Sequence, residues 1–366
     1  MSNVNRRVHD NRERQEALAE AWAQLRAAEP DLRPRNGAER LGVAEAELVS
    51  LSLGQGVRRL QPDWPTLFER LEPVGPVMAL TRNDHAVHER HGIYRDARLS
   101  TRMGLLNNPD IDLRIFLDHW HHLFAVNEWS SRGARESLQI FDREGIAVHK
   151  IYRTEESDGA AWNRLVDTLL DEDQSTPFVP EPATHRRADD NDRVDVDALL
   201  DGWDNLTDTH DFAPLLRRLK VGREQALALA GPGRARQVST EAIRVVMRRA
   251  ADRGLPVMVF VHNHGTIQIH TGTVRKLVDI HDWFNVIDPA FNLHLRMSGI
   301  AGAWMVRKPT DDGPVHSLEL YDEDSRLLLQ MFGERKRGRR EEAQWRAILE
   351  SLPSVDREAE PHHEPA

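Results

Sequence analysis

The chain has 366 residues, of which 40% are hydrophobic and 30% charged, and it contains no cysteine. This length suits two domains of a globular protein, and the lack of cysteine excludes disulfides, zinc knuckles, iron–sulfur clusters and thiolate nucleophiles. The formal net charge of -10 argues against a nucleic-acid partner, because phosphate binding needs a positive field.

The N-terminal stretch is polar and carries no sign of membrane targeting. Its sequence, MSNVNRRVHDNRERQEALAE, is helix-prone and lacks the apolar segment of a secretory signal. No run of the chain approaches the roughly 18 consecutive apolar residues that a membrane helix needs. We therefore expect a cytoplasmic protein that does not insert into a membrane.

Each half of the chain begins with a helical segment and continues with strands. Apolar residues recur at helical spacing in RLGVAEAELVSL, from Arg40, and in RLKVGREQALAL, from Arg218. The stretches VMVFVHN, TIQIHTG, LHLRM, AWMVRK and SLELYD alternate and are separated by turn residues, which is typical of short strands. The pattern predicts an α+β fold in which each half packs its helices on a mostly antiparallel β-sheet.

Composition also predicts the boundaries of the domains. Residues 171–192 contain three prolines and a charge run, so we expect a linker there. The linker separates an N-terminal repeat, residues 1–170, from a C-terminal repeat, residues 193–355. We expect residues 356–366 to form a disordered tail.

The two halves are copies of one another. PVMALTRN begins at Pro76 and PVMVFVHN at Pro256, and the same offset separates SLQIFD at Ser137 from SLELYD at Ser317. The helical stretches that begin at Arg40 and Arg218 match with a slightly shorter offset. The chain is therefore predicted to be a tandem duplication.

Several polar residues of the second copy have no counterpart in the first. His210, Lys308, Gln330 and Arg335 stand where the first copy has Leu32, Glu128, Lys150 and Glu155. Apolar positions were kept while these positions diverged, which indicates a polar site in the C-terminal half.

His210 lies in TDTHDF, just before an apolar helical stretch. One interpretation makes it an exposed residue of a helix start that is capped by Asp or Thr. The other makes it a metal ligand whose second ring nitrogen is fixed by a neighbouring acceptor, with Asp208, Asp211 and backbone carbonyls as candidates.

Longer stretches resemble a known family over nearly the whole chain. They include RNDHAVHERHGIY (82–94), DIDLRIFLDHWHHLFAV (110–126), LTDTHDFAPLLRRLKVGREQALALAG (206–231), WFNVIDPAFNLHLR (283–296) and FGERK (332–336). These blocks, in this order, are similar to the bacterial haem-utilisation proteins called hemin-degrading factors, the HemS/HmuS/ChuS/PhuS type. The resemblance implies that the bound group is haem b and that His210 is the axial ligand of its iron, a role that suits a neutral imidazole.

The same resemblance implies further haem contacts. Arg223, Lys308 and Arg335 would bind the propionates, although Arg223 could be a helix-surface residue and Lys308 a strand-end residue facing solvent. Arg114, with Phe116 on the same strand face, would reach the distal side, unless Arg114 only pairs with Asp112. Phe260, Gln330 and Phe332 would complete the walls, and Phe260 could equally be a core residue.

Two other histidine groups leave alternatives open. His262, His264 and His270 share parity, so an unbroken strand would place three imidazoles on one face as a non-haem metal site, although the Asn-His-Gly turn argues against this. The stretches DHWHH (118–122) and HAVHERH (85–91) could hold a second, weaker haem.

Two functional classes share the predicted pocket. The chain could be a cytoplasmic carrier that receives haem from an ABC importer and passes it to a haem oxygenase. It could instead be an enzyme that degrades haem and releases iron. We find no nicotinamide, flavin or other common catalytic motif, so an enzyme would need an external electron donor.

Overall fold

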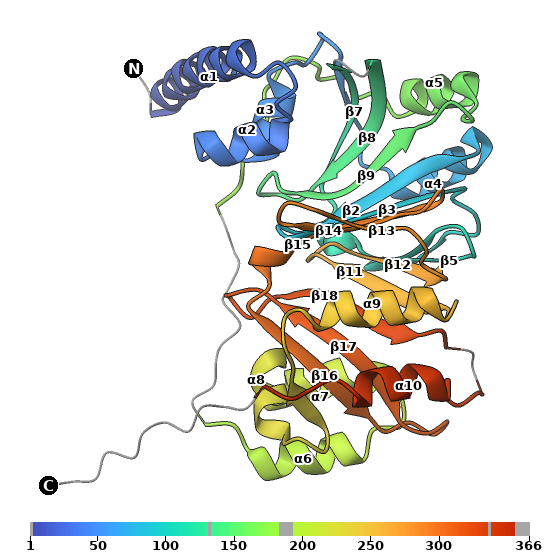
Figure 1. The fold of residues 1–366 in the computed structure, drawn as a ribbon. Coiled ribbons are helices and arrows are strands. Elements are labelled where there is room, and N and C mark those ends of the chain that lie inside the picture. Colours follow the sequence, from blue (N-terminus) through green and yellow to red (C-terminus); the bar gives the residue numbers. More distant parts are fainter. Residues whose placement is uncertain (1–2, 131–132, 183–192, 336–337, 356–366) are drawn as a thin grey trace, which may run out of the picture. The chain divides into compact units, whose positions relative to one another are not determined.

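The computed structural model describes residues 3–130, 133–182, 193–335 and 338–355 (Figure 1). The predicted tail, residues 356–366, and the second part of the predicted linker, residues 183–192, lie outside the described residues. Within the described part of the chain, no helix is both long and apolar enough to cross a membrane.

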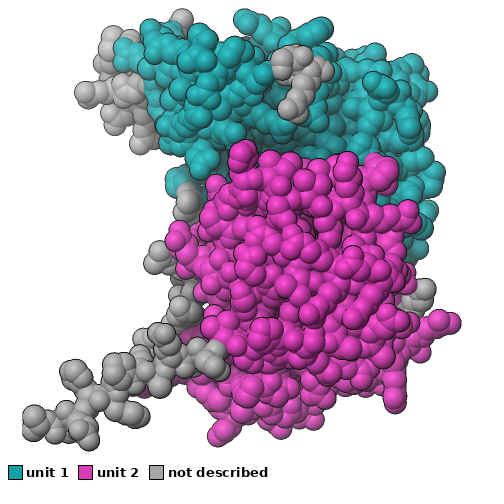
Figure 2. All heavy atoms as spheres, in the orientation of Figure 1, with its two compact units in different colours: residues 1–82, 87–185, 262–269 teal, residues 83–86, 186–261, 270–366 magenta. Residues whose placement is uncertain are grey.

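The chain forms two compact units (Figure 2). Unit 1 contains residues 1–82, 87–185 and 262–269, and unit 2 contains residues 83–86, 186–261 and 270–366. The units therefore follow the two copies except for two hairpin segments, each of which includes a turn and adjoining strand residues. Residues 262–269 of the second copy belong to unit 1, and residues 83–86 of the first copy belong to unit 2.

An asparagine in each exchanged turn provides hydrogen bonds within the unit that receives it. In unit 1, the Nδ2 group of Asn263 donates to the carbonyl oxygens of Arg82 and Val148 at 3.0 and 2.9 Å. In unit 2, the Nδ2 group of Asn83 donates to the carbonyl oxygen of Leu328 at 2.9 Å. These bonds satisfy backbone carbonyl groups and so stabilise the position of each turn.

Unit 1 combines five helices with antiparallel strands among its described residues (Figure 1). The helices are α1 (Asn3–Ala28), α2 (Pro34–Leu41), α3 (Glu45–Ser50), α4 (Trp64–Leu71) and α5 (Gly159–Thr168). One run of paired strands has the order β1 (Val57–Leu60), β7 (His122–Ser130), β8 (Gly133–Phe141), β9 (Ala147–Arg153), β2 (Val77–Arg82) and β3 (Ala86–Gly92). Another has the order β12 (Thr266–Gly272), β6 (Asp112–Phe116), β5 (Met103–Asn107) and β4 (Arg98–Leu99), and of β12 only residues 266–269 belong to this unit.

Unit 2 repeats this arrangement. Its helices are α6 (Val196–Asp204), α7 (Phe212–Leu219), α8 (Arg223–Ala230), α9 (Ala242–Asp252) and α10 (Ala343–Glu350). One strand run has the order β10 (Ala235–Gln237), β16 (Gly302–Lys308), β17 (Val315–Tyr321), β18 (Leu327–Gly333) and β11 (Val257–His262). The other has the order β15 (Phe291–Arg296), β14 (Trp283–Ile287) and β13 (Leu277–Ile280).

The equivalent elements confirm the predicted duplication and the α+β class. Strands β2, β7 and β9 are separated from β11, β16 and β18, respectively, by the same offset that relates Pro76 to Pro256. Helices α2 and α3 are separated from α7 and α8 by the shorter offset that relates Arg40 to Arg218. The strands are predominantly antiparallel, as expected from alternating segments joined by short turns.

Helices α6, α7 and α8 pack on β16 and β17 through one hydrophobic cluster. In α7, apolar residues at Phe212, Leu215, Leu216 and Leu219 follow the i, i+3, i+4, i+7 pattern of a helix with one buried face. Phe212 is 1% exposed and packs edge-on against the fully buried Trp203 of α6, with ring centroids 4.7 Å apart. This packing fixes the N-terminal end of α7.

The first part of the predicted linker is packed on unit 1. Phe178 is 6% exposed and belongs to a cluster with Val49, Phe124 and Phe141. The side chain of Gln174 exchanges two hydrogen bonds with the backbone of Arg59, at 3.0 and 2.8 Å. Residues 171–182 have the composition of a linker because most of them are polar, acidic or proline. The buried ring of Phe178 nevertheless anchors this segment to unit 1.

We expect Phe178→Ala to lower the free energy of unfolding by about 3–5 kcal/mol, because it leaves a cavity under this segment. Denaturant unfolding measures the change. Val179→Ala is the matched control, since Val179 is 50% exposed. A loose linker would make the two variants alike.

Candidate functional site

His210 lies in a short 3-10 turn, Thr209–Asp211, that leads directly into α7. The carboxylate of Asp208 accepts the backbone N–H of His210 at 2.9 Å. The carboxylate of Asp211 accepts the backbone N–H of Asp208 and the hydroxyl of Thr207, both at 3.0 Å. These reciprocal bonds form a capping box, which the residue types Asp and Thr before an apolar run favour.

The imidazole of His210 projects into solvent with one nitrogen fixed. Its Nδ1 atom lies 2.6 Å from the carboxylate of Asp208, and 87% of the side chain is exposed. The backbone N–H of His210, followed by its imidazole, holds the pKa of Asp208 below the usual value, so this carboxylate is ionised at neutral pH. An Nδ1–H donated to Asp208 leaves the lone pair of Nε2 available for a metal ion. Of the candidate acceptors considered for the ring, Asp208 is the one that contacts Nδ1.

Arg335 lies beside the same turn. Its NH1 group donates to the hydroxyl of Thr209 at 3.0 Å, and its charge helps to lower the pKa of Asp208. A cation thus stands next to the histidine, although the two partners of this bond are far apart in the chain.

A buried cluster of charged side chains lies next to Phe212, the first residue of α7. The carboxylate of Glu319, on β17, has no exposed surface and accepts two hydrogen bonds from Arg223, at 2.8 and 2.9 Å. It also accepts hydrogen bonds from Lys308 and Gln330, both at 2.9 Å, and from the hydroxyl of Tyr321 at 2.7 Å. Strand register accounts for part of this meeting, since Glu319 and Gln330 are directly paired in β17 and β18.

Phe212 connects this cluster to the histidine turn. The ammonium of Lys308 lies 4.6 Å and the guanidinium of Arg223 5.1 Å from the centre of the Phe212 ring, which follows His210 closely in the chain. Cations over an aromatic face are stabilised by the ring quadrupole.

The charges of the cluster perturb one another. Arg223 and Lys308 hold the pKa of Glu319 well below its usual range, against the opposing effect of burial. Burial lowers the pKa of Lys308 to about 8; the charge of Glu319 opposes this effect, and the charge of Arg223 adds to it. Glu319 is therefore ionised at neutral pH. Lys308 is a cation whose charged form is destabilised by burial.

Two predicted site residues with aromatic side chains lie on neighbouring strands of unit 2. The rings of Phe260, on β11, and Phe332, on β18, pack edge to face with centroids 5.2 Å apart. Both are half-buried, and Phe260 is directly paired with Gln330. Seven of the predicted site residues thus belong to one unit, and five of them are linked to the start of α7 or to Glu319 by direct contacts.

Comparison with known proteins gives the family. The model of the haemin-degrading HemS.ChuX domain matches residues 42–169 and 220–352, once in each copy. The chain belongs to the HemS family. It is 38% identical over 350 residues to the hemin transport protein HmuS of Yersinia pestis, covering 93% of this chain and 98% of that protein.

Solved structures of related proteins agree with this assignment. The fold is similar to that of holo-PhuS, a heme-binding protein from Pseudomonas aeruginosa, with a TM-score of 0.89 and 46% sequence identity over 93% of this chain and 99% of that one. It is also similar to ChuS, an E. coli heme oxygenase, with a TM-score of 0.82 and 36% identity over 91% of this chain and 98% of that one.

For Lys308 and Arg223 of this HemS-family chain, the sequence also allowed a simple surface position, which the structure excludes. Lys308 is 3% exposed, so it does not face solvent at a strand end. Arg223 is not a simple helix-surface residue, because its guanidinium is held in the bidentate pair with Glu319. Glu319 is not among the predicted site residues, although it differs from its counterpart Gln139 in the first copy just as Lys308 differs from Glu128.

Arg114 and Phe116 occupy half-buried positions of β6, which alternate with the buried Leu113 and Ile115, as parity predicted. The guanidinium of Arg114 donates to the carboxylate of Asp112 on the same strand. The simple pairing considered for Arg114 is therefore formed in unit 1.

The three histidines of the alternative metal site do not share a face. The turn at residues 263–265 ends β11 before β12 begins. His264 binds the carboxylate of Asp142 at 2.7 Å in unit 1, and His270 stacks on Phe291 in unit 2, with centroids 3.8 Å apart. The residues that the structure describes contain no group of three or more His, Cys, Asp or Glu arranged to hold a metal ion.

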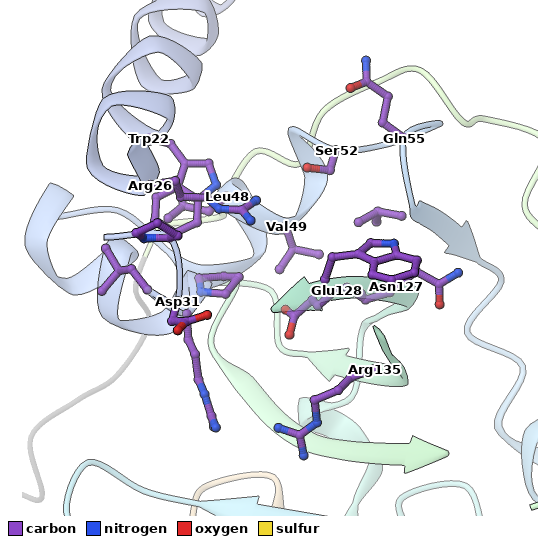
Figure 3. Close-up of a pocket in the computed structure, with 17 residues that line it drawn as sticks. Trp22, Arg26, Asp31, Leu48, Val49, Ser52, Gln55, Asn127, Glu128 and Arg135 are labelled. Atoms are coloured by element: carbon purple, nitrogen blue, oxygen red, sulfur yellow. The ribbon is translucent and has the colours of Figure 1, made fainter. Parts of the chain in front are cut away.

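The first copy has a cavity of about 330 Å³ but has no histidine at the position equivalent to His210 (Figure 3). Figure 3 shows Trp22 of α1, Glu128 of β7 and Arg135 of β8 around it. Leu32 and Glu128, which replace His210 and Lys308 in this copy, both line the cavity. None of the histidines in DHWHH or HAVHERH does so, and His88 is fully buried.

Proposed function

We propose that this chain binds one molecule of haem b in its second copy, with the Nε2 atom of His210 as the axial ligand of the iron. The observation that carries the proposal is the orientation of His210, whose Nδ1 atom is held by an ionised Asp208 while Nε2 faces solvent. A neutral imidazole with a fixed tautomer is a common ligand of haem iron.

The groups around His210 suit the rest of a haem molecule. Arg335 and the cluster of Arg223 and Lys308 provide positive charge for the two propionates, and guanidinium groups bind carboxylates through paired hydrogen bonds. Phe260 and Phe332 offer an apolar edge for the macrocycle, and Gln330 a polar contact. We assign Arg114 and Phe116 to the distal side on the strength of the family resemblance.

We propose transfer of haem as the principal role, with degradation to release iron as the second candidate. An exposed ligand suits a carrier, because exchange needs access to the iron. The names of the relatives support both roles, since one is a hemin transport protein and another a heme oxygenase. In this proposal the protein works in the cytoplasm between a haem ABC importer and a haem oxygenase, or with an external electron donor.

A titration with hemin followed by visible spectroscopy tests this function. Binding will produce a Soret band that saturates at one haem per chain. Ascorbate is then added with catalase present. Persistence of the band indicates a carrier, and its loss with release of iron indicates the enzyme. A chain that gives no Soret change would not have this function.

Asp208→Asn tests the support of the ligand. The amide can still cap the turn, but it is uncharged and a weaker acceptor for Nδ1–H, so the imidazole becomes less basic. We expect about a tenfold loss of hemin affinity with little change in stability. Asp204→Asn, which removes a surface partner of Arg234 in the same unit, is the control. Equal affinities for both variants would contradict the role of Asp208.

A further inference from the structure

Glu319 receives more hydrogen bonds than a carboxylate ordinarily accepts. Oε1 accepts from Arg223, Lys308 and Gln330, each at 2.9 Å, and from Ser317 at 3.2 Å. Oε2 accepts from Arg223 at 2.8 Å and from Tyr321 at 2.7 Å. Six donors therefore meet about four lone-pair sites. Donors to Glu319 are therefore in excess, and the other acceptor of Arg223 in the cluster is the hydroxyl of Tyr321, at 3.2 Å.

The cluster also lacks negative charge. It contains the two cations Arg223 and Lys308 and the single carboxylate Glu319, so it carries one net positive charge. The ammonium of Lys308 has three N–H donors, and within the described residues its hydrogen-bond acceptor is Oε1 of Glu319. A buried ammonium in this state is costly unless a second anion arrives. Arg223, with 24% of its side chain exposed, leaves the cluster open to such a ligand.

The residues equivalent to Glu319 and its charged partners all differ in the first copy. Gln139 replaces Glu319 there, and the partners change with it: Glu45, Glu128 and Lys150 stand in place of Arg223, Lys308 and Gln330. Glu45 and Lys150 form a buried ion pair in unit 1. Without the central carboxylate, the equivalent positions carry one net negative charge. Glu319 is therefore the partner on which the two cations of the second copy depend.

We propose that Glu319 holds Arg223 and Lys308 as a preformed site with one surplus positive charge, which selects a porphyrin that presents a carboxylate at this point. Glu319 acts through the two cations and is a positioning residue. The inference rests on the proposed function, since it concerns how the same pocket recognises a propionate. It adds a residue to that pocket and makes binding depend on proton uptake.

Proton uptake follows from the surroundings of Lys308. The charged or titratable groups that face it are Glu319 and Tyr321 on β17 and Arg223 on α8, while α7 presents the ring of Phe212 and β18 presents Gln330. Burial lowers the pKa of Lys308 to about 8 in the free protein. A ligand carboxylate favours the ammonium and raises that pKa. Above about pH 8, binding will therefore take up a proton and affinity will fall as pH rises.

Fluorescence titration with zinc protoporphyrin IX between about pH 7 and 10 tests this linkage without hydroxide ligation at iron. We expect a constant affinity for the wild type below about pH 8 and a loss of up to about tenfold per pH unit above it. The dimethyl ester of the same porphyrin should bind more weakly, and its affinity should not fall over this range. An ester whose affinity falls like that of the free acid would overturn the inference.

Variants at Glu319 separate charge from structure. Glu319→Gln removes the charge that favours the ammonium, so the midpoint of the affinity loss should move down by at least about one pH unit. Glu319→Asp keeps the charge and should keep the midpoint near that of the wild type. Glu136→Gln, which breaks the ion pair with Arg153 in unit 1, should behave as the wild type.

The outcomes distinguish this inference from the proposed function. A wild type whose porphyrin affinity is constant with pH, or a Glu319→Gln variant with the wild-type midpoint, overturns the role of Glu319 and leaves haem binding intact. A wild type that binds neither hemin nor zinc protoporphyrin overturns the proposed function itself. If Glu319→Gln does not fold, the ester and Glu319→Asp still decide the question.

Discussion

His210→Ala is expected to weaken hemin binding by about 100-fold or more and to abolish the wild-type Soret band. The substitution removes the proposed axial ligand, whereas changes in the groups that support a ligand cost about 10- to 100-fold. Folding should be affected little, because 87% of the side chain is exposed and it contributes one surface hydrogen bond. A hemin titration monitored at the Soret band measures the loss.

Added imidazole should restore the spectrum of His210→Ala, since free imidazole can occupy the axial position that the side chain leaves. The matched control is His281→Asn, which removes another exposed histidine of unit 2 at a position with φ of 51°, a conformation that Asn tolerates. It should bind hemin as the wild type does. If His210→Ala and His281→Asn give the same spectrum and affinity, His210 is not the ligand.

Glu319→Gln is expected to lower the free energy of unfolding by about 3–5 kcal/mol in the absence of ligand. The substitution leaves two buried cations, Arg223 and Lys308, without their shared carboxylate. Removing one partner of a buried ion pair is far more destabilising than exchanging the whole pair for apolar residues. Urea unfolding followed by circular dichroism measures the change. An unchanged midpoint would contradict the buried charge cluster.

Lys308→Met is the matched comparison within the same cluster. It leaves the neutral pair of Arg223 and Glu319 and relieves the surplus charge, so we expect little loss of stability. The pH dependence separates the two proteins further. Between about pH 8 and the usual lysine value of 10.5, the unfolded wild type binds more protons at Lys308 than the folded protein. The stability of the wild type should therefore rise with pH relative to Lys308→Met in that window.

Much of the fold follows from local patterns. Alternating segments such as SLELYD became strands, here β17, and RLKVGREQALAL includes the end of α7 and most of α8. The constant offset between matching segments of the two copies predicted pairs of equivalent strands that the structure contains. Such features depend on hydrophobic periodicity and turn chemistry, which short stretches of sequence express directly.

The exchanged turns and the packed start of the linker depend on distant partners instead. Asn263 looks like an ordinary turn residue, and its role comes from carbonyl groups of Arg82 and Val148, which are remote from it in the chain. Phe178 lies among prolines, and its burial depends on Val49 and Phe124. No periodicity in the local sequence encodes these contacts.

Part of the candidate site could be predicted from the sequence, because several of its residues differ between the two copies. That comparison selected His210, Lys308, Gln330 and Arg335, and three of these contact Glu319 or the histidine turn. Glu319 itself escaped notice because a single acidic residue between two leucines on a strand reads as a solvent-facing position. In the structure its carboxylate is fully buried and accepts hydrogen bonds from Arg223 and Lys308.

The central claim is that one imidazole, present only in the second copy, holds the iron of the bound porphyrin. A crystal grown with hemin tests it most directly, because the anomalous signal of iron locates the metal without reference to the protein. We expect one strong iron peak per chain, at bonding distance from Nε2 of His210. An iron peak ligated by a different residue would contradict this account.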